Sequence, residues 1–426
     1  MNVMTLLVKG HHPLGASVAI AIGLLLLTLP IVQALTFGSA IRITTNTGDS
    51  VSPSVATDGS GHVYVAWQDN TPVTGSGYSR EIWMRASPNN GASFGSAIRI
   101  TTNTGASLYP SVAASGTYVY VAWQDDTSVT GSGGNPEIWL RVSNNYGASF
   151  GPTIRITTNT GNSREPSVAA VGGYVYVTWD DDTPVTGSMG TTEVWMRVSS
   201  NYGASFGSAI RITHNTASSG FSSVAAVGNY VYVTWEDDTA VAGSGYLSEI
   251  WFRVSPNNGG SFGSPVRISY NTYQSMSPSV AAYGNYVYVA WMDNTPVTGS
   301  GTDYEVWMRV SSNYGASFGS AIRLTTNTGT SGFPSVAAVG TNVYVAWMDN
   351  TPVPGSGSDG GGEIWLRVSS NNGANFGSAI RITTNIYGSV NPSVAASVSH
   401  VYVAWDDQTP VPGSGSDSEI WLRVGS

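Results

Sequence analysis

Residues 94–149 read FGSAIRITTNTGASLYPSVAASGTYVYVAWQDDTSVTGSGGNPEIWLRVSNNYGAS, and close copies of this stretch fill the chain from residue 37 almost to its last residue. A Phe-Gly pair opens each of seven copies, and successive pairs lie 56 to 58 residues apart. A fixed period of this length is the signature of stacked or radial repeats. The fold of one copy, and the way seven copies close, therefore decide the architecture.

Each copy contains four short segments that are typical of β-strands, at residues 53–56, 62–67, 81–85 and 97–100 in the first copy. β-Branched and aromatic residues fill these segments, and Gly, Pro, Asn and Ser separate them. After residue 35 no stretch has the apolar period of a helix. Four antiparallel strands per copy are typical of a propeller blade, so we predict an all-β, seven-bladed β-propeller over residues 35–426.

The phase of the repeat predicts how the ring closes. The repeats begin with a fourth strand at residues 40–43 and stop after a third strand at residues 419–423. We expect the N-terminal strand to complete the C-terminal blade, because this pairing removes two free strand edges. The alternative is pairing with the last blade of another molecule, which would produce fibres.

Residues 1–34 lie outside the repeat and have the pattern of a secretory signal peptide. Lys9 precedes an apolar run at about residues 16–29, and small residues follow Pro30. The alternative is an uncleaved N-terminal membrane anchor. Both interpretations place the repeats outside the cytoplasm, secreted or on the cell surface.

The composition excludes several classes of function. Charged residues make up 10% of the chain and the net charge is -9, which argues against a nucleic-acid partner. The chain has no cysteine, so disulfides and thiolate metal sites are excluded. Packing and strand pairing must therefore supply the stability.

The turn between the third and fourth strands reads SPNNGASF at residues 87–94 and recurs in five further copies. Asn89 can accept hydrogen bonds from the amides of its own turn, and Gly91 supplies a positive φ. The motif resembles the Asp-box, or BNR repeat, of sialidase-like propellers, Ser-x-Asp-x-Gly-x-Thr/Ser-Trp/Phe. Asn replaces Asp in all six copies, and sialidases have six blades. The resemblance implies the fold and a structural role for the turn, but no reaction.

Fourteen of the 17 Lys and Arg residues are arginines that recur once per copy, in two sets represented by Arg99 and Arg85. Glu81, Trp83 and Arg85 share one face of the third strand because side chains alternate along a strand. We predict that Arg85 stacks on Trp83 and pairs with Glu81 or with the glutamate of the next blade. A ring of arginines that binds anionic sugar is the functional alternative.

An aspartate ends the second strand of every copy, and Asp69 is the first of them. The structural interpretation is an Asx turn that begins a long loop. The alternative is a Ca²⁺ site built from Asp69, the Asn70 side chain and loop carbonyls. Calcium is the only cofactor that the sequence suggests. Blades three and four carry additional acids at this point, interpreted as a solvated rim or a cation site: Asp180, Asp182, Glu236 and Asp238.

The residues that differ between copies cluster in two loops, one before the proline of the first strand and one before the repeated glutamate. Both loops emerge on the same rim of an antiparallel blade, so we expect the divergent residues to surround one mouth of the central channel. Aromatic side chains with a few polar groups fit carbohydrate or protein binding, and neutral drift is the alternative. The candidate ligand-binding residues are Tyr78, Arg80, Tyr109, Arg164, Glu165, Phe221, Tyr246, Asp303, Tyr304 and Phe333.

The sequence contains no recognisable catalytic site. A sialidase-like enzyme needs three arginines for the substrate carboxylate, and outside the repeat sets only Arg80 and Arg164 remain after residue 34. Other glycosidases need two suitably spaced carboxylates, for which Glu165 and Asp303 are the unshared candidates. We therefore predict a non-catalytic propeller that binds an extracellular glycan or a surface protein. The alternatives are a sialidase-like glycoside hydrolase and a structural component of a surface layer or filament.

Overall fold

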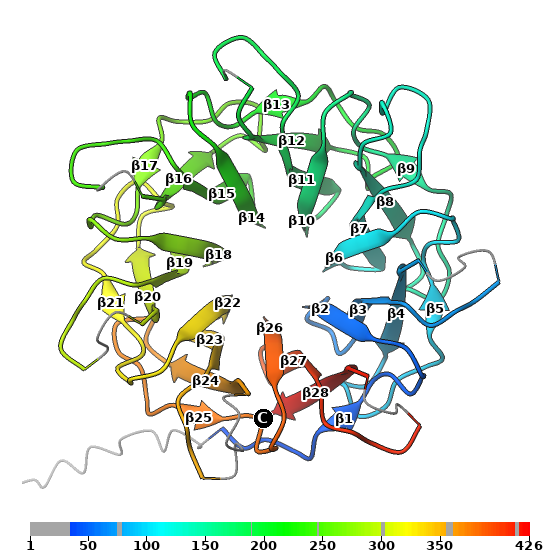
Figure 1. Ribbon diagram of the computed structural model, residues 1–426, viewed down its shortest axis with the longest axis vertical. Coiled ribbons are helices and arrows are strands. Elements are labelled where there is room, and N and C mark those ends of the chain that lie inside the picture. The colour runs from blue at the N-terminus through cyan, green and yellow to red at the C-terminus, as the bar shows by residue number, and fades with distance from the viewer. Residues whose placement is uncertain are drawn as a thin grey trace, which may run out of the picture. The chain divides into compact units, whose positions relative to one another are not determined.

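The computed structural model describes residues 35–74, 79–188, 190–244, 247–299, 303–354, 361–413 and 417–426. The signal peptide or anchor predicted for residues 1–34 lies outside this range. Thr36–Ser426 form one compact unit. This unit is the predicted propeller, with seven four-stranded antiparallel sheets around a central axis (Figure 1). None of the described residues belongs to a helix that could span a membrane.

The seven blades follow the order of the chain, and the first strand of each blade lies nearest the axis (Figure 1). Blade 1 contains β2 (Ser50–Thr57), β3 (Val63–Asp69), β4 (Glu81–Ser87) and β5 (Ile98–Arg99); blade 2 contains β6 (Ser107–Ser115), β7 (Tyr118–Asp125), β8 (Glu137–Ser143) and β9 (Ile154–Arg155); and blade 3 contains β10 (Ser163–Val171), β11 (Tyr174–Asp181), β12 (Glu193–Ser199) and β13 (Ile210–Arg211). Blade 4 contains β14 (Ser219–Val227), β15 (Tyr230–Asp237), β16 (Glu249–Ser255) and β17 (Val266–Arg267), and blade 5 contains β18 (Ser275–Tyr283), β19 (Tyr286–Asp293), β20 (Glu305–Ser311) and β21 (Ile322–Arg323). Blade 6 contains β22 (Ser331–Val339), β23 (Asn342–Asp349), β24 (Glu363–Ser369) and β25 (Ile380–Arg381), and blade 7 contains β26 (Ser389–Ala396), β27 (Val401–Asp407), β28 (Glu419–Gly425) and β1 (Ile41–Arg42).

The hydrophobic cores lie between adjacent blades. Val65 and Trp67 of β3, for example, pack with Tyr402 of β27 and Leu422 of β28. Every residue of β3 is buried, because each second strand has a neighbouring blade on both of its faces. This two-sided burial explains why the second strands show no clear alternation of apolar and polar residues.

A ring of hydrogen bonds also links the seven innermost strands. Ser54 Oγ of β2 accepts a hydrogen bond from the backbone N–H of Val112 in β6, at 3.0 Å. The equivalent bond joins every successive pair of blades, including Ser393 to Val55 across the closure. Each blade is thus held to the next at the channel as well as through its core.

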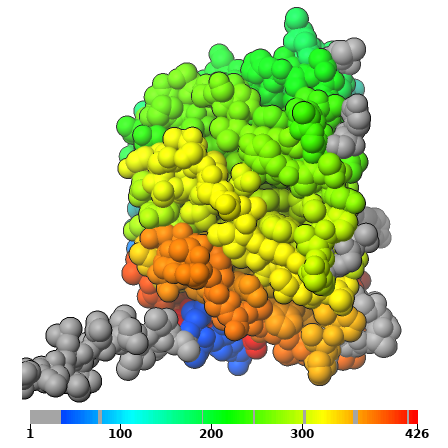
Figure 2. All heavy atoms as spheres, turned by 90° about the vertical axis from the view of Figure 1, so that its left-hand side faces the viewer, coloured from blue at the N-terminus to red at the C-terminus, as the bar shows by residue number. Residues whose placement is uncertain are grey.

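The predicted closure within one chain is confirmed. Strand β1 pairs with β28 in the register Ile41 to Leu422, and the N–H of Ile43 donates to the carbonyl of Ile420 at 2.8 Å. Figure 2 shows the first residues of this unit against its last residues. The closing strand therefore comes from the beginning of the repeats and covers what would otherwise be an open edge.

The turn between the third and fourth strands has the predicted geometry. Asn89 Oδ1 accepts hydrogen bonds from Ser93 N and Ser87 Oγ, both at 2.9 Å, and Gly91 has a φ of 79°. The bond from the backbone amide recurs in the other five turns. Asn in place of Asp is compatible with this turn, because the bonds need an oxygen acceptor rather than a charge.

The buried glutamate of each third strand pairs with the arginine of the fourth strand. Glu81 is fully buried, and its Oε1 accepts from Arg99 Nη2 at 2.8 Å; six equivalent ion pairs recur. The prediction that Glu81 pairs with Arg85 is wrong. Residues four apart along a strand are about 13 Å apart, whereas the neighbouring strand lies only about 4.8 Å away. The cation–π contact of Arg155 with Trp139, at 5.9 Å, also involves the fourth-strand set.

Candidate ligand-binding site at the channel mouth

Each innermost strand begins with a β-bulge. In blade 2 the pair Leu108–Gln124 is followed by Ser111–Ala122, so β6 contains one extra residue. Tyr109 lies in this bulge with a φ of 52°, a left-handed conformation that is uncommon for bulky residues. All seven blades repeat this conformation, with φ between 51° and 55°. The bulge residues are Ser52, Tyr109, Glu165, Phe221, Ser277, Phe333 and Asn391.

The bulges place their variable side chains around one mouth of the channel. The seven bulge residues, and the two residues that follow each of them, line a single cavity of about 430 Å³. The loops between second and third strands reach the same rim, because the carbonyl of Arg80 accepts from the N–H of Ser107, the first residue of β6. The two variable loops therefore share one face, and their sequence differences become differences around one opening.

Three of the bulge residues are exposed aromatic side chains. Tyr109, Phe221 and Phe333 are 45%, 51% and 48% exposed. Three exposed tyrosines elsewhere stack on a ring of the preceding blade: Tyr146, Tyr202 and Tyr314. Tyr146, for example, lies 4.3 Å from the ring of His62. Among the described residues, the three bulge aromatics have no such stacking partner. Their rings remain available to a ligand.

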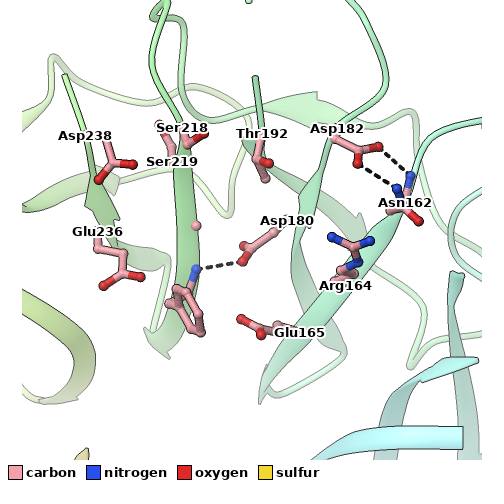
Figure 3. Close-up of a pocket in the computed structure, with 12 residues that line it drawn as sticks. Asn162, Arg164, Glu165, Asp180, Asp182, Thr192, Ser218, Ser219, Glu236 and Asp238 are labelled. Carbon is pink, nitrogen blue, oxygen red and sulfur yellow. Dashed lines mark hydrogen bonds between the residues drawn. The ribbon is translucent and has the colours of Figure 1, made fainter. Parts of the chain in front are cut away.

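A second cavity, of about 230 Å³, opens between blades 3 and 4 and is rich in acids. Glu165 comes from β10, Asp180 from β11 and Glu236 from β15. Figure 3 shows the carboxyl groups of Glu165 and Asp180 on one side of β14 and that of Glu236 on the other, where its Oε2 accepts the N–H of Ser277 at 3.3 Å. Arg164 lines the same cavity, as does Phe221, which it shares with the channel mouth. Asp182 is held to one side by two hydrogen bonds of 2.6 Å from Asn162. Three strands of two blades thus bring carboxyl groups to one edge of the channel.

Asp180 is the most enclosed of these acids. Its side chain is only 6% exposed, and its Oδ2 accepts the N–H of the bulge residue Phe221 at 2.6 Å. Its Oδ1 is buried without a hydrogen-bond partner in the protein. Gly220 makes room for the carboxylate, because a Cβ at that position would stand 3.0 Å from Asp180 Oδ2. A buried oxygen without a partner is unusual and indicates a place for a ligand group or a proton.

Burial controls the protonation of the cluster. It raises the pKa of Glu165 to about 7, although nearby Arg164 partly offsets this effect. It raises the pKa of Glu236 to about 7 as well. Burial, followed by repulsion from Glu165, raises the pKa of Asp180 well above its usual value. At neutral pH the cluster therefore contains protonated carboxyl groups, which can donate hydrogen bonds as well as accept them.

We expect the protein to lose stability as the pH rises from about 5 to about 8. Glu165 and Glu236 have folded pKa values above the unfolded value, so between about 4.5 and 7 the folded state binds more protons than the unfolded state. Their stabilising contribution is complete below about pH 4.5 and is lost as the pH rises through about 7. The difference is on the order of 2 kcal/mol per group. Thermal unfolding at pH 5 and pH 8 measures it.

The double variant Glu165→Gln/Glu236→Gln should weaken this pH dependence and be more stable than wild type at pH 8. Part of the dependence should remain, because burial also raises the pKa of Asp406 to about 7. The matched control is Asp126→Asn, an exposed acid on the rim of blade 2. This control should keep the wild-type pH dependence. An unchanged pH profile in the double variant would contradict the proposed burial of the two glutamates.

The structure brings together some of the predicted ligand-binding residues and not others. Glu165, Arg164 and Phe221 line the acidic cavity, and Tyr109 and Phe333 line the channel mouth. The other described candidates, which line neither cavity, are Arg80, Asp303 and Tyr304. Tyr78 and Tyr246 lie outside the described residues.

Tyr304 has a partner of its own, since its hydroxyl donates to Gln274 Oε1 at 2.9 Å. Arg80 lies 3.9 Å from Asp49. Asp180 and Glu236 were predicted to lie in a solvated rim or a cation site; the solvated interpretation is wrong, because both carboxyl groups are largely buried. The available signal was the position before the repeated aspartate, which reads Gln, Gln, Asp, Glu, Met, Met and Asp in the seven blades. That position faces the bulge of the next blade, and acids there are enclosed.

The repeated aspartates form the Asx turn. Asp69 Oδ1 accepts the N–H of Thr71 at 2.8 Å, and this bond recurs in all seven blades. Asp69 Oδ2 accepts from Asn46 Nδ2, Ser50 Oγ and Trp67 Nε1.

The neighbouring Asn70 Oδ1 accepts the N–H of Asp49 at 2.6 Å. The turn accounts for these bonds, and in the described part of the chain no three acidic or histidine side chains group as metal ligands. The calcium site at Asp69 and Asn70 stays a prediction, which calcium titration would test.

Comparison with known proteins agrees with the propeller architecture. A family profile for the LVIVD repeat matches residues 110–127, 221–240 and 275–295, which lie in the first two strands of blades 2, 4 and 5. No curated protein sequence matches the chain. These three matches cover only short segments.

Solved structures similar to this chain include a Dyadobacter fermentans protein of unknown function, with 12% identity and a TM-score of 0.53 over 93% of this chain and 100% of that one. The α-L-arabinofuranosidase of Fusarium graminearum has 12% identity and a TM-score of 0.50, over 91% and 98% of the two chains. Trypanosoma rangeli sialidase has 10% identity and a TM-score of 0.46; the match covers 92% of this chain but only 58% of the sialidase. Similarity at this level concerns the fold alone.

Proposed function

We propose that this protein is a secreted or cell-surface propeller that binds an extracellular glycan at the mouth of its channel. The observation that carries the proposal is the set of seven strained bulges, which aim variable side chains at one cavity. Backbone strain that recurs at one place indicates a role for that place, because a strained conformation costs about 1–3 kcal/mol per residue. Three exposed aromatic rings at this mouth offer flat apolar surfaces for sugar rings.

The acidic cavity would supply the polar contacts to the same ligand. Asp180 Oδ1 lacks a partner in the protein, and Glu165 and Glu236 are protonated in part at neutral pH. Carboxyl and guanidinium groups together can match the mixed donors and acceptors of sugar hydroxyls. Phe221 borders both cavities and would contact the ligand at their junction.

The proposal includes two further inferences: that the protein is exported, and that its repeats are Asp-box repeats. The pattern of residues 1–34 supports export by a signal peptide, with an uncleaved anchor as the alternative. We infer that the six turns between third and fourth strands are Asp-box variants in which Asn performs the role of Asp. Their hydrogen bonds lie within the turn, which supports a structural role for them.

Substitution of the bulge aromatics tests the binding site. Tyr109→Ala, Phe221→Ala and Phe333→Ala should each weaken binding of the best ligand from a glycan array by about tenfold, since buried aromatic contacts dominate such sites. Titration calorimetry measures the affinities. Tyr283→Ala is the matched control, because this tyrosine is equally exposed at the opposite end of an innermost strand. Equal losses in all four variants, or binding by none of the arrayed glycans, would contradict the proposal.

A glycoside hydrolase is the second candidate, and the acid cluster favours it. A carboxyl group with a pKa near 7 beside a second carboxyl group is suited to acid catalysis at a glycosidic bond. Incubation of the bound glycan with the protein, followed by chromatography, distinguishes the two functions. Release of sugar that Asp180→Asn and Glu165→Gln abolish would establish the hydrolase. Binding without release supports the non-catalytic propeller.

A further inference from the structure

Grooves on the outer side of the propeller, away from the channel mouth, contain aromatic and cationic side chains that have no part in the proposed function. In blade 4 a cavity of about 400 Å³ is lined by Trp251 and Arg253 of β16, by Thr239, and by His214 from the connection between blades 3 and 4. The equivalent residues of blade 7 line a cavity of about 200 Å³: Trp421, Arg423, Thr409 and Thr384. The repeat therefore builds the same kind of groove at different positions around the ring.

Each groove contains hydrogen-bonding groups without a partner in the protein. In blade 4 these are Trp251 Nε1, Arg253 Nε and Thr239 Oγ1. The equivalent three atoms lack partners in all seven blades: Trp83, Trp139, Trp195, Trp307, Trp365 and Trp421; Arg85, Arg141, Arg197, Arg309, Arg367 and Arg423; and Thr71, Thr127, Thr183, Thr295, Thr351 and Thr409. Buried polar groups are normally satisfied, so a sevenfold set of exceptions calls for a common explanation.

The guanidinium group in each groove also lacks a counter-ion. The third-strand glutamates are occupied by the fourth-strand arginines, as Glu249 is by Arg267. Arg253 instead donates from Nη1 to the carbonyl of Ile212. Asp237, which lines the same groove, accepts four hydrogen bonds from other groups. Among the described residues no carboxylate forms an ion pair with Arg253, and a half-buried cation without one favours an anionic ligand.

We propose that the outer grooves bind the anionic groups of an acidic saccharide, with one group in each groove. Two of the three unpartnered groups are N–H donors, which require an acceptor, and the guanidinium without a counter-ion selects a negatively charged one. A sulfate or carboxylate group meets both requirements. The indole of the groove tryptophan offers an apolar surface for the attached sugar ring. Repetition around the ring would give such a polymer several contacts at once.

Blade 5 provides an internal comparison. Tyr270 occupies the position of His214 there, and its ring lies 5.1 Å from the guanidinium of Arg309 and 4.9 Å from that of Arg267. The groove cation of blade 5 is therefore covered by the chain's own aromatic ring. We expect this groove to contribute less to anion binding than those of blades 4 and 7.

Calorimetric titration with a sulfated disaccharide at low salt tests the proposal. The double variant Arg253→Gln/Arg423→Gln should bind roughly two fewer disaccharides per molecule than wild type, because the sites are far apart and independent. Arg253→Lys/Arg423→Lys keeps the charge but not the planar donor group, and should weaken binding at these two grooves. Arg309→Gln is the matched control and should leave the stoichiometry unchanged. Thermal unfolding verifies that each variant is folded.

Other outcomes would overturn the proposal. A neutral disaccharide that binds as tightly as the sulfated one would exclude selection for an anion. Inorganic sulfate that binds as tightly would make the groove a small-anion site, not a saccharide site. An unchanged stoichiometry in both double variants would remove the grooves from the binding surface. The channel-mouth variant Phe221→Ala should leave this titration unchanged, so the outer grooves and the proposed function fail independently.

Discussion

Deletion of residues 36–44 is expected to unfold the propeller or to lower its Tm by about 10 °C or more. The deletion removes β1, whose neighbour Ile43 is fully buried against Leu422 in the core between blades 7 and 1. It also removes Arg42 and Thr44, the two partners of the buried Glu419. A buried charge left without a partner costs about 3–5 kcal/mol, and loss of the Ile43 side chain adds about 2 kcal/mol.

Differential scanning calorimetry of the deleted protein measures this effect. Addition of a synthetic peptide with the sequence of residues 36–44 should restore part of the lost stability, because it can pair with the open edge of β28. The matched comparison is Ile43→Ala against Ile212→Ala, since both side chains are fully buried at equivalent positions. A deleted protein with wild-type Tm would show that closure by β1 contributes nothing.

Glu81→Gln is expected to destabilise the protein by about 3–5 kcal/mol, the second large effect. The substitution leaves the Arg99 guanidinium beside a neutral amide and disturbs the hydrogen bond between Thr101 and Glu81. Burial raises the pKa of Glu81, and its hydrogen bonds with Thr101 and Arg99 oppose this rise, so the carboxylate depends on these two partners. Urea unfolding monitored by tryptophan fluorescence gives the change in unfolding free energy.

The companion variant Glu81→Leu/Arg99→Met removes both charges. It separates the destabilisation caused by an unpaired charge from the stabilisation that the ion pair contributes. Replacement of both buried partners by apolar residues of similar size is often nearly neutral. The double variant should therefore be more stable than Glu81→Gln. A double variant as unstable as the single one would mean that the ion pair itself, and not the unpaired charge, carries the stability.

The repeat allowed the architecture to be predicted in detail. The Phe-Gly period predicted seven blades, and the phase of the first and last strands predicted that residues 40–43 would close the ring. Both features depend on strand order, which a regular sequence pattern reveals directly. The turn at Asn89 was equally accessible, because its hydrogen bonds connect residues at most four positions apart.

The candidate site could be predicted only in part. Tyr109, Phe221 and Phe333 stood out as differences between otherwise equal copies, and they lie at one mouth of the channel. The sequence indicated that Asp180 belongs to a solvated rim or a cation site at the end of a strand. Its burial results from the bulge of the next blade, whose Phe221 amide it accepts. A bulge of one residue leaves no distinct mark in a sequence, so the change of residue at the position before the repeated aspartate was the available signal, and it did not by itself reveal the enclosure or the raised pKa.

By itself the sequence determined the number of blades, the order of the strands and the loops in which the copies differ, because these follow from local pattern and period. The tertiary structure alone decided which charges meet. Glu81 pairs with Arg99 rather than Arg85 because the neighbouring strand is closer than the same strand four residues along. It also decided that Asp180 and Glu165 lie close together, since the distances between strands of different blades depend on how the whole ring packs.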